Sequence, residues 1–170
     1  MVGIAAFIFS ELTFFGALIV TFLLYRTRSP GPNPHDLDVP RTLFFSLFLF
    51  ASSGTLYLAE RSHANQRRFM MWWVLSIVLG AIFLIGQLTE YQRLYEEGIR
   101  ISTNLFTSAF YTLTGFHGLH VLVGLTALSV VALLRGRQRT GVMVVSVYWH
   151  FVDAIWVLIF SLVYLWGLFA

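Results

Sequence analysis

The chain is built from long apolar runs that are separated by shorter polar segments. The apolar runs cover about residues 2–25, 42–59, 70–88, 105–134 and 141–168. Because a helix needs ~20 apolar residues to cross the hydrocarbon core of a bilayer, each run predicts one transmembrane helix. Membrane-spanning strands would alternate apolar and polar residues, whereas these runs are continuous. The pattern therefore predicts an all-α integral membrane bundle of five transmembrane helices, with residues 1–170 forming a single transmembrane domain.

The composition supports this prediction and excludes an ordinary soluble domain. Hydrophobic residues make up 58% of the chain, charged residues make up 11%, and the mean hydropathy is +0.77. These values lie far from those of soluble domains. The first apolar run does not have the pattern of a cleavable signal peptide, because no basic segment precedes it and Glu11 lies in its middle. We expect it to remain as a helix.

The arginines predict the orientation of the bundle. Six of the eleven basic residues lie in the second and fourth polar segments, which are short and adjoin helix ends. Arginines in such segments are typical of the cytoplasmic side, so we expect the N-terminus inside and the C-terminus outside. Arg135, Arg137 and Arg139 in the fourth segment are candidates for contact with anionic lipid head groups. The formal charge of +3 is spread over the polar segments and does not indicate nucleic-acid binding.

Ionisable residues inside the predicted spans are the first candidates for a functional site. They are Glu11, His117, His120, His150 and Asp153. Each costs about 3 kcal/mol near the centre of a bilayer, so each requires a partner or a function. The rise of an α-helix places most of them within roughly 10 Å of the membrane midplane, where they could form one polar layer. The three-residue spacings put His117 and His120 on one face of their helix, and likewise His150 and Asp153.

Three interpretations of this polar layer remain open. A metal or haem site is the weakest, because two histidines three residues apart do not complete a ligand set. A proton relay is stronger, since chains of Glu, His and Asp serve that purpose in membrane pumps. We favour a structural interpretation, in which the groups hydrogen-bond one another and define how the helices pack. Gln87, Glu90 and Tyr91 lie near the end of the third apolar run, where we expect them to be more easily solvated.

Two further sets of residues predict close helix packing. Gly115 and Gly118 lack side chains that would keep a neighbouring helix away. Trp149 and Trp156 belong to a stripe on the last helix that is suited to packing against a neighbour.

The absence of cysteine limits the redox chemistry of this chain. Without cysteine, the chain cannot form disulfides, iron–sulfur clusters, thiolate copper centres or covalent haem attachments. Any redox metal would depend on histidines, and the spans contain too few of them for several haem and copper sites. We predict no metal site and no cofactor of its own in this chain.

Five segments in order along the chain carry a specific family resemblance. They are FIFSELTFFGAL (7–18), SSGT (52–55), LGAIFLIGQLTEY (79–91), SAFYTLTGFHGLHVLVG (108–124) and YWHFVDAIWVLIFSLVYLWG (148–167). In order and spacing they resemble successive helices of subunit III of the haem–copper oxidases. Larger members of the family have two additional helices before the Ser-Glu pair. The chain resembles the five-helix form found in bacterial cytochrome c oxidases.

The resemblance implies a non-catalytic subunit of a respiratory terminal oxidase in a bacterial plasma (inner) membrane. In that family the haems and copper belong to partner subunits, and subunit III packs on subunit I and supports proton uptake and stability during turnover. Subunit II, small subunits and membrane lipids are further expected partners. The intramembrane residues Glu11, His117, His120, His150 and Asp153 match family positions, none of which is a redox ligand. The whole complex, rather than the isolated chain, would carry out oxygen reduction coupled to proton translocation.

Two other functions compete with this one. A bo-type quinol oxidase, or a homologue associated with nitric oxide reductase, would use a similar subunit III. A protein of another class, an independent proton channel or transporter, would use Glu11, His120 and Asp153 as its pathway.

Overall fold

The computed structural model describes residues 2–28, 38–134 and 139–165. Within these ranges five helices are long and apolar enough to span a membrane, which confirms the predicted fold class. The helices are α1 (Val2–Arg28), α2 (Val39–Arg61), α3 (Gln66–Glu96), α4 (Leu105–Leu133) and α5 (Arg139–Phe160), and α5 continues into the π-helical turn η2 (Ser161–Leu165).

Polar side chains set where the helices begin. The Asp38 carboxylate accepts a hydrogen bond from the backbone N–H of Arg41 at 3.0 Å, and Pro40 stands in the first turn of α2, where its missing N–H costs nothing. Asn104 caps α4 and exchanges hydrogen bonds with Thr107 in a capping box.

α3 extends well beyond the predicted apolar run, and it includes polar residues at both of its ends. The edge of an apolar run marks the edge of the bilayer core, but a helix ends only where its backbone is capped. Here Gly98 has a φ of +80°, and the N–H of Ile99 donates to the carbonyl of Leu94 at 2.9 Å. This Schellman motif requires the left-handed conformation that glycine adopts readily, and it stops the helix.

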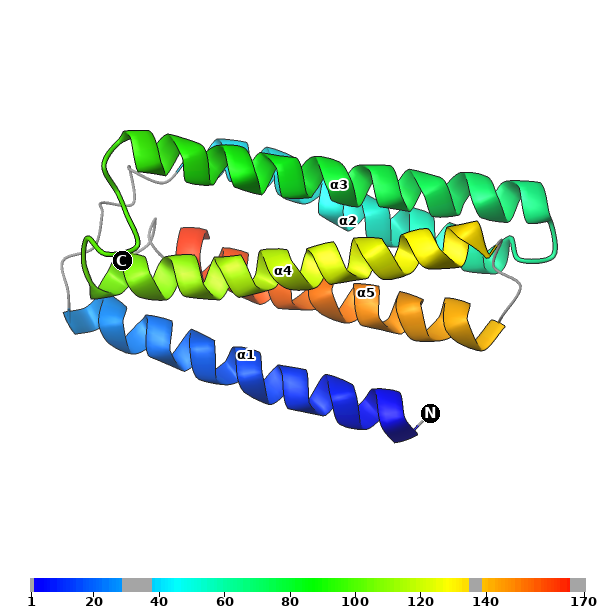
Figure 1. Ribbon diagram of the computed structural model, residues 1–170, viewed down its shortest axis with the longest axis horizontal. Helices are drawn as coiled ribbons and strands as arrows, with labels where there is room; N and C mark the ends of the chain where they lie inside the picture. The colour runs from blue at the N-terminus through cyan, green and yellow to red at the C-terminus, as the bar shows by residue number, and fades with distance from the viewer. Residues whose placement is uncertain (1, 29–37, 135–138, 166–170) are drawn as a thin grey trace.

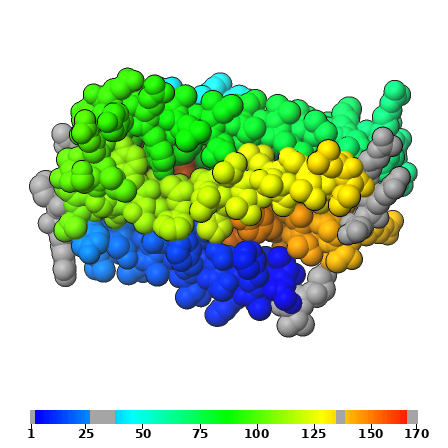
Figure 2. Space-filling view, in the orientation of Figure 1, coloured from blue at the N-terminus to red at the C-terminus, as the bar shows by residue number. Residues whose placement is uncertain are grey.

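The helices form three layers (Figure 1). α2 and α3 form one layer, α4 and α5 form the next, and α1 lies outside against α4 and α5. α2 also contacts α5 and α3 contacts α4, so α2 to α5 together make a four-helix bundle. The space-filling view shows α1 lying along the outside of this bundle (Figure 2).

The core of the bundle consists of aromatic rings seated against glycines and hydrogen-bonded across helices. A Cβ added to Gly80 or Gly124 would lie 2.7 Å from the ring of Trp149, so these two positions accept no side chain without rearrangement. Three buried indole N–H groups donate to neighbouring helices: that of Trp73 to the Leu128 carbonyl, that of Trp149 to Ser52 and that of Trp156 to Ser46. In a bilayer, such steric fit and hydrogen bonding hold helices together, because lipid tails are as apolar as the core.

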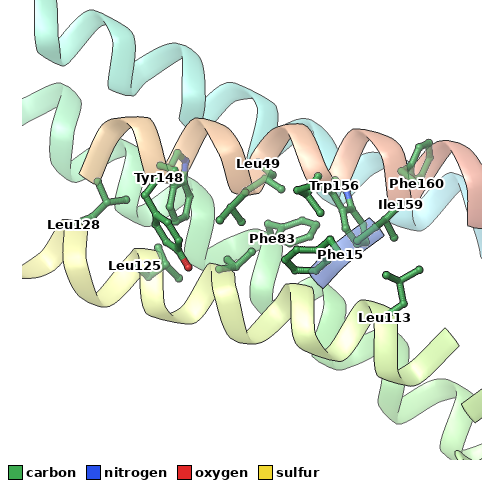
Figure 3. Close-up of a cluster of buried hydrophobic side chains, with 14 of the residues drawn as sticks. Phe15, Leu49, Phe83, Leu113, Leu125, Leu128, Tyr148, Trp156, Ile159 and Phe160 are labelled. Carbon is green, nitrogen blue, oxygen red and sulfur yellow. The ribbon is translucent and has the colours of Figure 1, made fainter. Parts of the chain in front are cut away.

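Figure 3 shows where the core meets α1. The side chains of Phe15, Phe83 and Trp156 come together between the helices. Phe15 and Phe22 are buried on the inner side of α1, whereas large side chains on its other side, such as Phe9, are exposed.

Candidate functional site

The hydrogen bonds of the intramembrane ionisable residues divide four of the five into two separate groups. The first group joins Glu11 of α1 to His120 of α4, with 2.9 Å between the carboxylate Oε2 and the imidazole Nε2. The ring of Phe15 lies 4.9 Å from the His120 ring and covers it edge-on. The hydroxyl of Tyr148 on α5 donates to the His120 carbonyl at 3.1 Å. This group therefore ties three helices together.

The hydrogen bonds of His120 determine how protons are arranged in this group. Its Nδ1 lies 2.7 Å from the carbonyl oxygen of Phe116, and because a carbonyl can only accept, Nδ1 carries a proton. The bridge between His120 Nε2 and Glu11 then holds one proton, which belongs either to a neutral carboxyl group or to an imidazolium. In both states the pair has no net charge. A pair without net charge lowers the cost of placing ionisable groups in the membrane.

His117 belongs to neither group. It is fully buried, and its ring stacks on Trp156 with 4.8 Å between the centroids. Neither of its ring nitrogens has a hydrogen-bond partner in the described part of the chain. Within the described part of the chain, the expectation that His117 forms hydrogen bonds with other buried polar groups is therefore wrong. The reason is that His117 points into the aromatic core, whereas His120, three residues later, points toward α1.

The second group lies on the other side of α5, where this helix meets α2. The Oγ of Ser53 lies 3.2 Å from Nδ1 of His150. Ser53 also interacts with the Asp153 carboxyl, whose Oδ1 has no partner among the described residues. The bond of His150 thus runs to α2, and not to Asp153 along its own helix as the spacing had allowed. All three side chains are partly exposed.

A third polar cluster lies at the end of α3, and our sequence prediction for it is wrong. Glu90 is only 3% exposed and Gln87 is also buried, although both were expected to be solvated. Glu90 pairs with Arg93 at 2.7 Å, and the Tyr91 hydroxyl lies 2.6 Å from that of Thr114 on α4. Because α3 continues through this segment, the neighbouring helices cover it. The three-residue spacing of Glu90 and Arg93 places both on one face of a helix, and this spacing could have predicted their ion pair.

The glycines and tryptophans chosen from the sequence lie in different surroundings. Trp149 and Trp156 are buried between helices. A Cβ at Gly115 or Gly118 would meet its nearest neighbour at an ordinary 3.8 Å. The close approach on α4 occurs at Gly124 instead, because the large indole of Trp149 faces that position.

The remaining predicted residues are the three arginines of the fourth polar segment. Arg139 is exposed at the first turn of that helix. Arg135 and Arg137 lie outside the described residues. Across the ranges that the structure describes, no three His, Cys, Asp or Glu side chains are grouped as a metal ion would require.

Fold and site together define a class: a multi-pass helical membrane protein in which an intramembrane acid and a histidine, Glu11 and His120, are paired across helices. Comparisons with known proteins place it within that class. The family model described as cytochrome c oxidase subunit III matches residues 1–168, and the chain belongs to this family.

Individual relatives agree with the family match. The chain is 39% identical to the cytochrome c oxidase subunit 3 of Corynebacterium diphtheriae, over 96% of this chain and 86% of that one. It is 38% identical to the protein of the same name from Synechocystis sp., over 97% of this chain and 75% of the relative. A probable cytochrome c oxidase subunit 3 of Mycobacterium tuberculosis is 36% identical, with 96% and 86% covered. The resemblance stated from the sequence motifs is therefore confirmed.

Proposed function

We propose that this chain is the non-catalytic subunit III of a cytochrome c oxidase in a bacterial plasma membrane. The observation that carries the proposal is the family match over residues 1–168, together with relatives that are named as this subunit. In this role the chain packs against the catalytic subunit, which holds the haems and copper, and it contacts subunit II and lipids. Its N-terminus lies in the cytoplasm, as the arginine distribution suggests.

The Glu11–His120 pair supports a role next to proton uptake. It holds one proton in a 2.9 Å bridge inside the spans, where water is scarce. Release of this proton toward a neighbouring subunit leaves the pair with one negative charge, which attracts the next proton to the site. Asp153 and His150 add two further ionisable groups in α5. The same pair also anchors α1, so its proton-related and structural roles act through one bond.

Purification through a tag on this chain tests the proposal. We expect a polytopic subunit with haem and copper to co-elute from mild detergent, and its optical spectrum identifies the haems. A co-eluting subunit II with a dicopper cysteine motif indicates cytochrome c as the donor, whereas its absence together with quinol oxidation indicates the quinol oxidase alternative. Elution of this chain without any haem protein would contradict the proposal.

Deletion of the chain tests its non-catalytic role. We expect the haem and copper content of the remaining oxidase to be unchanged, while activity decays faster during turnover. Loss of the metal centres themselves would show that the chain helps to build them. The purified chain alone in liposomes should conduct no protons; a conductance that Glu11→Gln abolishes would favour the independent channel.

A further inference from the structure

A small cavity lies between the first turns of α2 and the second half of α3. Its volume is about 10 Å³, and its lining includes three polar residues, Thr42, Gln87 and Glu90, and two aromatic residues, Phe45 and Phe83. A cavity needs roughly 10–15 Å³ to hold one water molecule. This space, the α2–α3 cavity, therefore has the size of a single water molecule and is too small for a lipid chain or a larger ligand.

Two of the lining residues carry a buried polar atom without a partner in the described ranges. These atoms are Oγ1 of Thr42 and the amide Nε2 of Gln87. The hydroxyl of Tyr164 on η2 also lacks a hydrogen-bond partner there, and it interacts with Thr42 from beyond hydrogen-bond distance. Nearly all buried polar groups in proteins are hydrogen-bonded, either to other protein groups or to ordered water. Two unpartnered atoms on the lining of one water-sized cavity thus indicate a bound molecule.

The charged and polar groups around the α2–α3 cavity favour an uncharged ligand. A cation is disfavoured, because Arg41 also lines the cavity and the amide N–H groups of Gln87 can only donate. An anion is disfavoured by the carboxylate of Glu90. Water has no charge, and it can accept a hydrogen bond from an amide while it donates to a carboxylate.

We propose that the α2–α3 cavity is a binding site for one water molecule, which accepts a hydrogen bond from Gln87, bonds to the Thr42 hydroxyl and donates to the Glu90 carboxylate. Three hydrogen bonds are the usual number for a buried water. The water joins α2 to α3 near the point where the backbone N–H of Asp38 lies 3.4 Å from Oε1 of Glu90. It also gives the buried carboxylate a donor in addition to Arg93. The proposal concerns the interior of this chain alone and goes beyond the proposed subunit III function, so the failure of one leaves the other standing.

X-ray radiolysis of the purified full chain in detergent tests for the water directly. Radiolysis converts water into hydroxyl radicals, which oxidise neighbouring side chains before they diffuse away, and mass spectrometry locates the oxidised residues. Phe83 lines the cavity and is 1% exposed, whereas Phe110 is 2% exposed and lies outside the cavity lining. We expect Phe83 to be oxidised several-fold faster than Phe110, because a bound water produces radicals beside it.

The variant Gln87→Met shows whether that water lies in the α2–α3 cavity. It removes the amide donor and keeps a side chain of similar length, so the oxidation rate of Phe83 should fall to that of Phe110. Equal rates for the two phenylalanines in the unmodified chain would overturn the proposal. A fast rate at Phe83 that Gln87→Met leaves unchanged would overturn the assignment of the water to this cavity.

A double-mutant cycle tests the bridge between the two helices. Thr42→Val removes the hydroxyl and retains the shape of the side chain. Each of Thr42→Val and Gln87→Met should lower the denaturant midpoint of unfolding, and the double variant should lower it no further than the larger single effect, because either change removes the same water. Additive effects would contradict a shared water.

Thr112→Val provides the matched control for this cycle. The Thr112 hydroxyl donates to the Ser108 carbonyl within α4 at 2.7 Å, away from the cavity lining. Its effect should add to that of Gln87→Met, since the two residues share no partner. Circular dichroism checks the folding of each variant, and if the cavity variants do not fold, the oxidation rates of Phe83 and Phe110 in the unmodified chain decide the proposal.

Discussion

α1 and the four-helix bundle of α2 to α5 are attached to the molecule in different ways. Only 11% of the residues in the most apolar part of α1 are buried, against 33–44% in the other four helices. The bundle is held by rings against glycines and by three indole hydrogen bonds across helices. α1 is held by Phe15 and Phe22, by the Glu11–His120 bridge, and by a hydrogen bond from Arg26 to the Leu162 carbonyl.

This difference shows that one membrane protein can combine two kinds of helix association. The bundle depends on steric fit, so a change in side-chain volume disturbs it. α1 buries little surface, so a single polar pair carries a larger share of its attachment. Each prediction below tests one side of this contrast on the isolated chain in detergent.

The largest effect is expected for Trp156→Ala in the bundle. Trp156 is fully buried, stacks on His117 and donates to Ser46 at 2.8 Å. Removing its ring should lower the free energy of unfolding by about 3–5 kcal/mol, because a cavity remains and the Ser46 hydroxyl loses its donor. Phe9→Ala on the exposed side of α1 is the control and should change stability by less than about 0.5 kcal/mol. Denaturant unfolding followed by circular dichroism measures the stability of both variants. Equal losses of stability would contradict the difference between α1 and the bundle.

Gly124→Ala should have the next largest effect. The added methyl group would lie 2.7 Å from the Trp149 ring, which must then move. Overpacking of this kind costs about 1–3 kcal/mol. Gly16→Ala on α1 is the matched control, because its Cβ would meet no atom within 4 Å. A thermal scan of both variants should show destabilisation only for Gly124→Ala; a loss at Gly16 would mean that α1 is packed as tightly as the bundle.

The Glu11–His120 bridge should contribute a smaller amount, concentrated on α1. A double-mutant cycle with Glu11→Leu and His120→Leu should give a coupling free energy between about 0.6 and 1.7 kcal/mol, the average and the maximum found for interhelical hydrogen bonds in a membrane protein. Glu11→Gln should retain most of the coupling, because its amide N–H can donate to Nε2 of His120.

A cycle with zero coupling would show that Phe15 and Phe22 alone attach α1. If Glu11→Gln loses as much as Glu11→Leu, the bridge requires the ionised pair rather than a neutral hydrogen bond. Unfolding in detergent, followed by circular dichroism, provides all the required free energies.

Ser46→Ala is expected to have the smallest effect of the series. It removes the acceptor of the Trp156 indole but leaves the ring packed, so stability should fall by about 0.6 kcal/mol. Ser10→Ala provides a control, because its hydroxyl donates to the Phe7 carbonyl within α1. Indole fluorescence during unfolding should show this lower stability for Ser46→Ala. A loss of stability larger than that of Gly124→Ala would reverse the predicted order of the effects.

The sequence predicts the spans well because crossing a bilayer is a requirement on each segment by itself. The beginning of α4 at Leu105 and the number of helices agree with the apolar runs. The end of α3 does not, because hydropathy reports the extent of the bilayer core, whereas the Gly98 motif reports the end of the helix. The ionisable residues were also identifiable one by one, since each stands out against an apolar run.

How those residues are grouped could not be predicted from the sequence. Helical spacing restricts which residues share a face, but it says nothing about which neighbouring helix that face meets. Glu11 and His120 are 109 positions apart, and only the packing of α1 on α4 brings them within 2.9 Å. Packing likewise gave His150 a partner on α2 and left His117 in an aromatic core.

By itself, the sequence determined that this protein is a five-helix membrane bundle of the cytochrome c oxidase subunit III family, because apolar length and local motifs are properties of single segments. The tertiary structure alone decided that α1 stands outside the bundle, that Glu90 is buried and that the acids and histidines form separate groups. These properties depend on steric fit between helices that are distant along the chain, such as Trp149 against Gly80 and Gly124. No local pattern records that fit.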